Sequence, residues 1–203
     1  MLEFASASKS FDGKTVVRSA TLSLRAGEIL CLTGPSGIGK TTLLELAAGV
    51  TKPDAGRVSR TVKASLMFQD DVLIPWQTAE EAITYILPDA MPERERLERA
   101  ALWLETFELE GGIYPAAMSG GMRRRLSLAR TFAAERPLVL LDEPFAFLDT
   151  ERCRLVMAAI VRHVRNGGTV MLTSHTTEPL DVSEPDAPVV RLVSVTHSPI
   201  TIS

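Results

Sequence analysis

The stretch GPSGIGKT, from Gly34 to Thr41, decides the fold because it matches the pattern G-x-x-x-x-G-K-[ST]. A short apolar run from Ile29 to Leu32 precedes it, and a helical apolar pattern that stops at Gly49 follows it. In a loop of this kind, backbone N–H groups converge on a polyphosphate, a lysine, here Lys40, neutralises its oxygens, and a hydroxyl binds Mg²⁺. The alternative, a glycine-rich surface turn, explains neither the strand before the loop nor the helix after it.

The composition around this loop is that of an ordinary globular protein. Its 203 residues are 45% hydrophobic and 23% charged, which excludes a disordered chain and leaves enough apolar residues for a core. The formal net charge of -3 offers no attraction for nucleic acid. Cys31 and Cys153 belong to no Cys/His cluster, so we interpret both as structural thiols of a reducing compartment. No signal peptide and no apolar run near the ~18 residues of a membrane span is visible, so we expect a cytoplasmic location.

The regions on either side of the loop indicate a β part and a helical part. The turn from Phe11 to Lys14 and the alternation around it predict antiparallel strands within the first ~65 residues. Further along the chain, a helix is expected from Pro92 to Phe107, with Leu97, Ala101 and Leu104 on its buried face.

Two carboxylates follow a second buried strand. The run from Leu138 to Leu141 is typical of a strand of a parallel sheet, and Asp142 and Glu143 come directly after it. A helix from Thr150 to Val164 and another buried strand from Val170 to Thr173 come next. Ligands of open α/β sheets bind where the strands end, so Asp142 can hold Mg²⁺ and Glu143 can polarise a water for attack on a phosphate. Taken alone, two such acids more often cap a helix.

The segment from Met118 to Met122 carries the next motif. Alone, it could be a plain N-capped helix with a solvated basic face. Together with the phosphate loop, it resembles the signature of the ATP-binding-cassette (ABC) ATPases, usually Leu-Ser-Gly-Gly-Gln, and the resemblance extends over almost the whole chain. Met122 stands at the glutamine position, which puts a ribose or base contact in doubt but leaves the phosphate contacts expected from Ser119 and Gly121.

Four further positions resemble motifs of that family. Gln69 resembles the glutamine that touches Mg²⁺ and the attacking water, although by itself it reads as a loop residue. Asp149 resembles the D-loop aspartate, with a helix N-cap as the alternative. His175, at the end of a strand, resembles the switch histidine that contacts the γ-phosphate. Phe11 stands where the family has an aromatic residue that stacks on adenine, with a place in a small core as its alternative.

The resemblance implies a complete set of site residues. ATP and Mg²⁺ are the implied ligands. The implied catalytic residues are Glu143, His175 and Gln69, and the implied metal ligands are Thr41, Gln69 and Asp142. The residues implied to bind the nucleotide are Phe11, Gly34, Pro35, Ser36, Gly37, Gly39, Lys40, Thr41, Thr42, Ser119, Gly120, Gly121 and Asp149.

The expected fold class is α/β. We expect a P-loop NTPase core of the RecA-like kind with a parallel sheet, an antiparallel β subdomain, and a helical subdomain inserted at about residues 78–136. The whole chain, 1–203, would be one nucleotide-binding domain. The resemblance implies two chains paired head to tail, as a homodimer or with a sister ATPase. It also implies a transmembrane permease that this subunit drives from the inner face of the membrane, and an indirect link to a solute-binding protein.

Two rival functions remain to be weighed. Thr51 to Asp54 fits the guanine-reading pattern [NT]-K-x-D of GTPases. It follows the phosphate-loop helix at once and forms a turn, whereas a guanine motif should follow a late strand. The other rival is a non-transport cassette ATPase that acts on nucleic acid or ribosomes. Those proteins resemble paired or split cassettes, and this chain has one uninterrupted cassette without a basic excess, so transport is favoured.

The segment from Phe68 to Thr78 suggests a subfamily and a docking surface. It looks like bacterial importer ATPases of the nitrate, sulfonate and taurine group, in which a Leu-x-Pro-Trp segment follows the glutamine. Apolar residues clustered in a surface loop, here Val72 to Trp76, usually mark a partner site. The alternative is that Trp76 packs under the helix that begins after Thr78.

Overall fold

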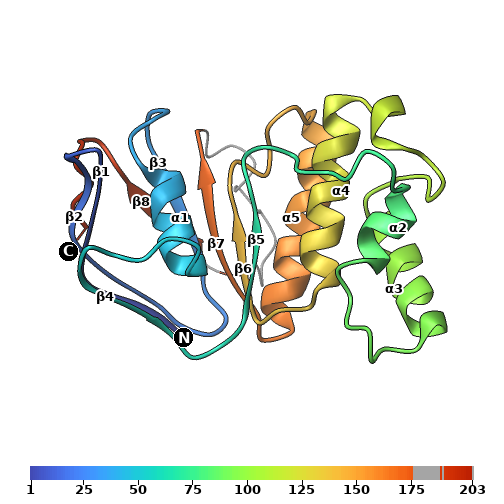
Figure 1. The fold of residues 1–203 in the computed structure, drawn as a ribbon, viewed down its shortest axis with the longest axis horizontal. Helices are drawn as coiled ribbons and strands as arrows, with labels where there is room; N and C mark the ends of the chain where they lie inside the picture. The colour runs from blue at the N-terminus through green and yellow to red at the C-terminus, as the bar shows by residue number, and fades with distance from the viewer. Residues whose placement is uncertain (176–187, 189, 203) are drawn as a thin grey trace.

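A parallel sheet forms the centre of the protein. The structure is a computed structural model, and it describes residues 1–175, 188 and 190–202 (Figure 1). The five strands of this sheet stand in the order β5-β6-β7-β3-β8, and each adjacent pair is parallel. They are β3 (Ile29–Thr33), β5 (Ala64–Met67), β6 (Leu138–Leu141), β7 (Thr169–Ser174) and β8 (Val190–Ser194).

An antiparallel sheet forms one end of the molecule (Figure 1). Its strands stand in the order β2-β1-β4, and they are β1 (Leu2–Phe11), β2 (Lys14–Leu24) and β4 (Ala55–Arg60). The predicted antiparallel β part within the first ~65 residues is confirmed. The strand β3 lies within the same stretch of sequence but belongs to the parallel sheet.

Helices cover the parallel sheet and extend away from the antiparallel sheet. The helix α1 follows β3, and α4 and α5 lie toward the other side of the parallel sheet, with α2 and α3 beyond them (Figure 1). The helical elements are α1 (Lys40–Ala48), α2 (Ala79–Thr84), α3 (Glu93–Thr106), the short 3-10 helix η1 (Pro115–Ala117), α4 (Gly120–Ala133) and α5 (Thr150–Arg165). That residues 78–136 form an inserted subdomain of a single unit stays a prediction.

The core strands divide their side chains between two clusters. Leu30 and Leu32 of β3 belong to the cluster that contains α1 and the antiparallel sheet, whereas Ile29 and Cys31 belong to the cluster that contains α4 and α5. Alternate residues of a strand point to opposite faces, so one fully apolar strand fills both layers. Burial in this core raises the pKa of the Cys31 thiol to about 12, which keeps the thiol protonated and unreactive.

The buried face of α3 differs from the predicted one. Leu104 is buried as predicted, but Leu97 is 40% exposed and Ala101 is also exposed, and Ala100 and Trp103 are buried in their place. The ring of Trp103 stacks on Phe132 of α4 with 5.3 Å between the ring centroids. A buried tryptophan removes far more apolar surface from water than Leu97 would, so Trp103 sets the rotation of the helix.

The described helices carry no candidate membrane span. Among the residues that the structure describes, none forms a helix long and apolar enough to cross a bilayer. Thr78 and Glu81 form a capping box at the start of α2, because the Thr78 hydroxyl accepts from the backbone N–H of Glu81 and the Glu81 side chain accepts from that of Thr78.

Candidate nucleotide-binding site

The ends of the parallel strands bring distant sequence motifs to one edge. Met67 pairs with Leu141 and Leu141 with Leu172, so the residues that follow β5, β6 and β7 emerge side by side. Gln69 follows β5, Asp142 and Glu143 follow β6, and His175 follows β7. The phosphate loop follows β3, which is paired with β7. The phosphate loop, both carboxylates and the histidine therefore lie together at the carboxyl edge of the sheet.

Glycine is required at two positions of the loop. Gly34 has φ +148° and Gly39 has φ +117°, and residues that carry a side chain rarely adopt such backbone conformations. A Cβ atom on Gly39 would lie 2.6 Å from Cγ1 of Val16, and one on Gly34 would collide with the backbone oxygen of Val195. The loop thus packs closely against β2 and against the chain that follows β8.

The ammonium group of Lys40 lies inside this loop. Its Nζ donates hydrogen bonds to the backbone oxygens of Gly34, at 2.7 Å, and Pro35, at 2.9 Å. The residue is only 5% exposed, and its Nζ lies 3.8 Å from Oε1 of Glu143. Ser36 and Gly37 form the exposed tip of the loop, and Thr42 is half-buried in the first turn of α1. A positive charge is therefore held within the loop by two backbone oxygens, where it can neutralise the oxygens of a polyphosphate.

Asp142 joins the loop helix to the strand β7. Its Oδ2 accepts from the Thr41 hydroxyl and its Oδ1 accepts from the Thr173 hydroxyl, both at 2.6 Å. Asp142 is 2% exposed, so these two bonds are what make a buried carboxylate tolerable. Thr173 was not identified as a site residue in the sequence. A hydroxyl near the carboxyl end of a buried strand was the available signal.

This donor set fits a magnesium ion. Mg²⁺ takes oxygen ligands and is usually held by one or two carboxylates together with hydroxyls, waters and substrate phosphates. Asp142 and Thr41 supply a carboxylate and a hydroxyl 2.6 Å apart at the mouth of the loop. No group of three or more His, Cys, Asp or Glu side chains with metal-site geometry occurs among the described residues.

Glu143 is held in an unusual backbone conformation. Its φ is +51°, in the left-handed region, and its backbone N–H donates to the Thr173 hydroxyl at 2.9 Å. Its carboxylate lies 3.1 Å from Nε2 of His175. Burial raises the pKa of the Glu143 carboxyl above its usual range, while the nearby charges of His175 and Lys40 oppose the rise. A carboxyl with a raised pKa at a sheet edge is suited to proton transfer.

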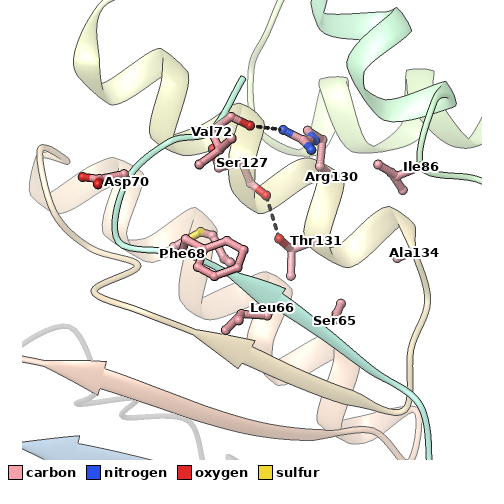
Figure 2. A pocket seen from close by; sticks show the side chains of 11 residues that line it. Ser65, Leu66, Phe68, Asp70, Val72, Ile86, Ser127, Arg130, Thr131 and Ala134 are labelled. Carbon is pink, nitrogen blue, oxygen red and sulfur yellow. Dashed lines mark hydrogen bonds between the residues drawn. The ribbon is translucent and has the colours of Figure 1, made fainter. Parts of the chain in front are cut away.

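Gln69 lies in a loop that is tied to α4. The side chain of Gln69 is exposed. Arg124 of α4 is 1% exposed and donates to the backbone oxygen of Phe68 at 3.2 Å and to Oδ1 of Asp71 at 3.1 Å. Arg130 donates to the backbone oxygen of Val72 at 2.7 Å, beside a pocket of about 250 Å³ (Figure 2). Sequence reasoning missed Arg124, and the alternative of a solvated basic face on α4 is wrong at this position.

Ser119 and Asp149 both cap helices. The Ser119 hydroxyl accepts from the backbone N–H of Met122 at 3.2 Å, and the Asp149 carboxylate accepts from that of Arg152 at 2.8 Å. A second pocket, of about 450 Å³, separates the starts of α4 and α5. It is lined by Ser119, Gly120, Gly121, Arg125, Phe147, Leu148, Asp149 and Arg152. Within the described part of the chain, no hydrogen bond or ion pair joins Ser119 or Asp149 to the phosphate loop.

Phe11 and Trp76 lie at the surface. Phe11 is 44% exposed at the end of β1, so it does not fill a core. Trp76 is 78% exposed, and its predicted alternative position under the helix α2 is therefore wrong.

The fold and this edge define a P-loop nucleotide-binding protein of the α/β class. The ABC transporter family matches residues 17–146. The chain belongs to the ABC transporter family.

The chain is similar to several import ATP-binding proteins. It is 37% identical over 186 residues to a sulfate/thiosulfate import ATP-binding protein of Chromobacterium violaceum, covering 84% of this chain and 50% of that protein. It is 36% identical over 199 residues to an aliphatic sulfonates import ATP-binding protein of Cupriavidus pinatubonensis, with coverages of 92% and 63%. It is 35% identical over 190 residues to a taurine import ATP-binding protein of Escherichia coli O157:H7, with coverages of 88% and 74%. The chain thus spans half to three quarters of the length of these relatives.

A solved structure extends the similarity to three dimensions. It is a dimeric, post-hydrolysis state of an ATP-binding cassette bound to ADP and Pi, with a TM-score of 0.83 and 26% identity. The match covers 88% of this chain and 90% of that one. The predicted fold class, a parallel P-loop core with an antiparallel sheet and helices, is confirmed.

Proposed function

We propose that this chain is the ATP-hydrolysing nucleotide-binding subunit of an ABC importer. The observation that carries the proposal is the connected network at the carboxyl edge: Lys40 in its loop, Asp142 bonded to Thr41 and Thr173, and Glu143 beside His175. Each group is held by hydrogen bonds or ion pairs within the chain, so the site is organised for a nucleoside triphosphate before one binds.

The phosphate loop binds the triphosphate. Its backbone N–H groups and the start of α1 face the phosphates, and Lys40 exchanges its bonds to Gly34 and Pro35 for phosphate oxygens. Asp142, Thr41 and Gln69 would hold Mg²⁺, which neutralises charge that develops on the phosphates. Thr173 keeps the Asp142 carboxylate oriented toward Thr41.

Glu143 is the general base of hydrolysis. Its carboxylate accepts a proton from a water whose oxygen forms a bond to the γ-phosphorus, while the bond from that phosphorus to the bridging oxygen breaks and ADP leaves. His175, at 3.1 Å from Glu143, holds this carboxylate and donates to a γ-phosphate oxygen. Phe11 stacks on the base.

A second copy completes the site. The pocket at Ser119, Gly120 and Gly121 lies at the start of α4, where free backbone N–H groups and the helix dipole favour an anion. We assign it to the γ-phosphate of the nucleotide held by the partner chain, with Asp149 at the same interface. A head-to-tail pair, of two copies or with a sister ATPase, is supported by the dimeric cassette that this chain resembles.

The subunit drives import through a separate membrane permease. The support is the similarity to import ATP-binding proteins for sulfate/thiosulfate, nitrate, sulfonates and taurine, which favours a small solute that carries an oxyanion group. The exposed Trp76, in the loop after Gln69, is suited to docking the permease. This role places the subunit in the cytoplasm against the inner face of the membrane, with a solute-binding protein acting indirectly through the permease.

The test is phosphate release by the purified chain. We expect hydrolysis of ATP that requires Mg²⁺ and stops when the ion is removed with EDTA. Rates that depend more steeply than linearly on protein concentration would support the paired site. If the purified chain does not hydrolyse ATP at high protein concentration with Mg²⁺, the proposal that this chain alone forms an ATP-hydrolysing site is contradicted.

A further inference from the structure

The turn that mimics a guanine-reading motif is clamped onto β1. Oδ1 of Asp54 accepts from Lys9 Nζ and Oδ2 accepts from the backbone N–H of Ser10, both at 2.7 Å. The backbone N–H of Asp54 donates to the oxygen of Ser8 at 2.8 Å. The bonds from Lys9 and Ser10 lower the pKa of the Asp54 carboxyl, so it stays ionised. Both carboxylate oxygens are engaged within the chain, so this aspartate does not read a guanine.

Lys9 connects this clamp to an aromatic ring. Its Nζ lies 5.3 Å from the centroid of the Phe11 ring, within the range of a cation–π contact. Its side chain is 16% exposed, whereas Phe11 is 44% exposed. One face of the Phe11 ring is thus covered by a lysine that Asp54 holds in place.

The ring lies on the hairpin that borders the phosphate loop. Phe11 pairs with Lys14 across the turn between β1 and β2. Two residues further along β2, Val16 packs against Gly39 of the loop so closely that a Cβ on Gly39 would lie 2.6 Å from its Cγ1. The hairpin and the loop are therefore fixed relative to each other.

We infer that Asp54 and Lys9 are positioning residues that hold Phe11 as a one-sided platform for the base of the bound nucleotide. This inference rests on the proposed function, because it takes Phe11 as the residue that stacks on the base. A ring already fixed from one side loses less conformational freedom when a base stacks on its other side. The clamp therefore increases affinity for the base without touching the nucleotide.

The experiment compares two ligands that differ in the base. Calorimetry measures binding of ATP and of inorganic tripolyphosphate to the wild type and to Lys9→Met, Asp54→Asn and Phe11→Ala. Lys9→Met is expected to weaken ATP binding about two- to fivefold, the range of an exposed cation–π contact, with tripolyphosphate affinity unchanged. Asp54→Asn should act in the same direction, Phe11→Ala should act at least as strongly, and Lys9→Arg should restore affinity.

A matched control removes a charge from the same turn. Lys52 is exposed two residues before Asp54, so Lys52→Met should change neither affinity. If Lys9→Met weakens both ligands equally, or lowers the melting temperature instead of ATP affinity, its role is electrostatic or structural and the inference is overturned. If Phe11→Ala loses base-dependent affinity while Lys9→Met binds ATP like the wild type, only the clamp is refuted. If Phe11→Ala itself binds ATP normally, the role of Phe11 within the proposed function fails first.

Discussion

The carboxyl edge of the parallel sheet, with its phosphate loop, and the signature pocket, which is the pocket at Ser119, Gly121 and Asp149, are built in opposite ways. At the edge, Lys40 bonds to the backbone of its own loop. Asp142 accepts from Thr41 of α1 and from Thr173 of β7, and the backbone N–H of Glu143 also donates to Thr173. In the signature pocket, the side-chain hydrogen bonds found for Ser119 and Asp149 among the described residues lie within their own helix starts, and the exposed Phe147 is one of the lining residues. The groups of the first site are thus connected within one chain, whereas within the described residues those of the second have no connection to the phosphate loop of the same chain. This arrangement is expected when each site is made from two chains.

The largest effect is expected at Glu143. Glu143→Gln should reduce hydrolysis about 100- to 10,000-fold, because the attacking water loses its proton acceptor, while ATP binding is retained. Phosphate release and size-exclusion chromatography with ATP will measure the rate and a trapped dimer. The control is Glu151→Gln, which alters an exposed carboxylate in the first turn of α5. A Glu143→Gln protein that hydrolyses ATP at the parental rate would remove the general-base role.

Loss of Lys40 should damage binding itself. Lys40→Ala is expected to weaken ATP affinity about ten- to a hundredfold, because a charged hydrogen-bond donor to the phosphates is removed. Calorimetry with ATP measures this, and Lys52→Met, at an exposed site, serves as the charge control. Unchanged affinity in Lys40→Ala would contradict the phosphate-loop assignment.

The pH profile reports the environment of Glu143. A general base must be ionised, so kcat/KM should fall about tenfold per pH unit once the pH drops below the pKa of this carboxyl. Because burial raises that pKa, the fall should begin at a higher pH than for an ordinary glutamate. Rates from about pH 3.5 to 9 at low ATP concentration give the profile, and a limb at the position of an unperturbed carboxyl would count against the buried base.

Mixing two inactive variants tests the unfinished pocket. Lys40→Ala removes the phosphate lysine, and Gly121→Asp places a negative charge where the partner's phosphate should bind. Its Cβ also meets the backbone oxygen of Phe147 at 3.0 Å. In a mixed dimer one of the two composite sites is intact, so an equal mixture should recover about a quarter of the wild-type rate. No recovery on mixing would indicate that both groups act within one chain.

The smallest effect on the isolated chain is expected at Trp76. A side chain that is 78% exposed contributes little packing, so Trp76→Ala should change stability by less than about 0.5 kcal/mol and leave hydrolysis unchanged. Thermal unfolding and phosphate release measure both. Co-purification with the permease and solute uptake should be lost, and retained permease binding together with a collapsed melting temperature would refute the docking role.

The sequence alone determined the class of this protein and the order of its main elements. Each motif is defined by residues that lie close together along the chain, so it can be recognised in the sequence. The three motifs are Gly34 to Thr41, the carboxylates after Leu141, and Met118 to Met122. Capping at Thr78 could be predicted for the same reason, because the groups that bond are three residues apart.

Only the tertiary structure decided which distant groups meet. Thr173 reaches Asp142 from 31 residues away, Arg124 reaches Asp71 from 53, and Lys9 reaches Asp54 from 45. The rotation of α3 follows the buried set Ala100, Trp103 and Leu104, in which the Trp103 ring stacks on Phe132 of another helix. Local patterns record what a segment buries, but a buried polar partner depends on strand order and helix packing, which bring residues together regardless of their separation along the chain.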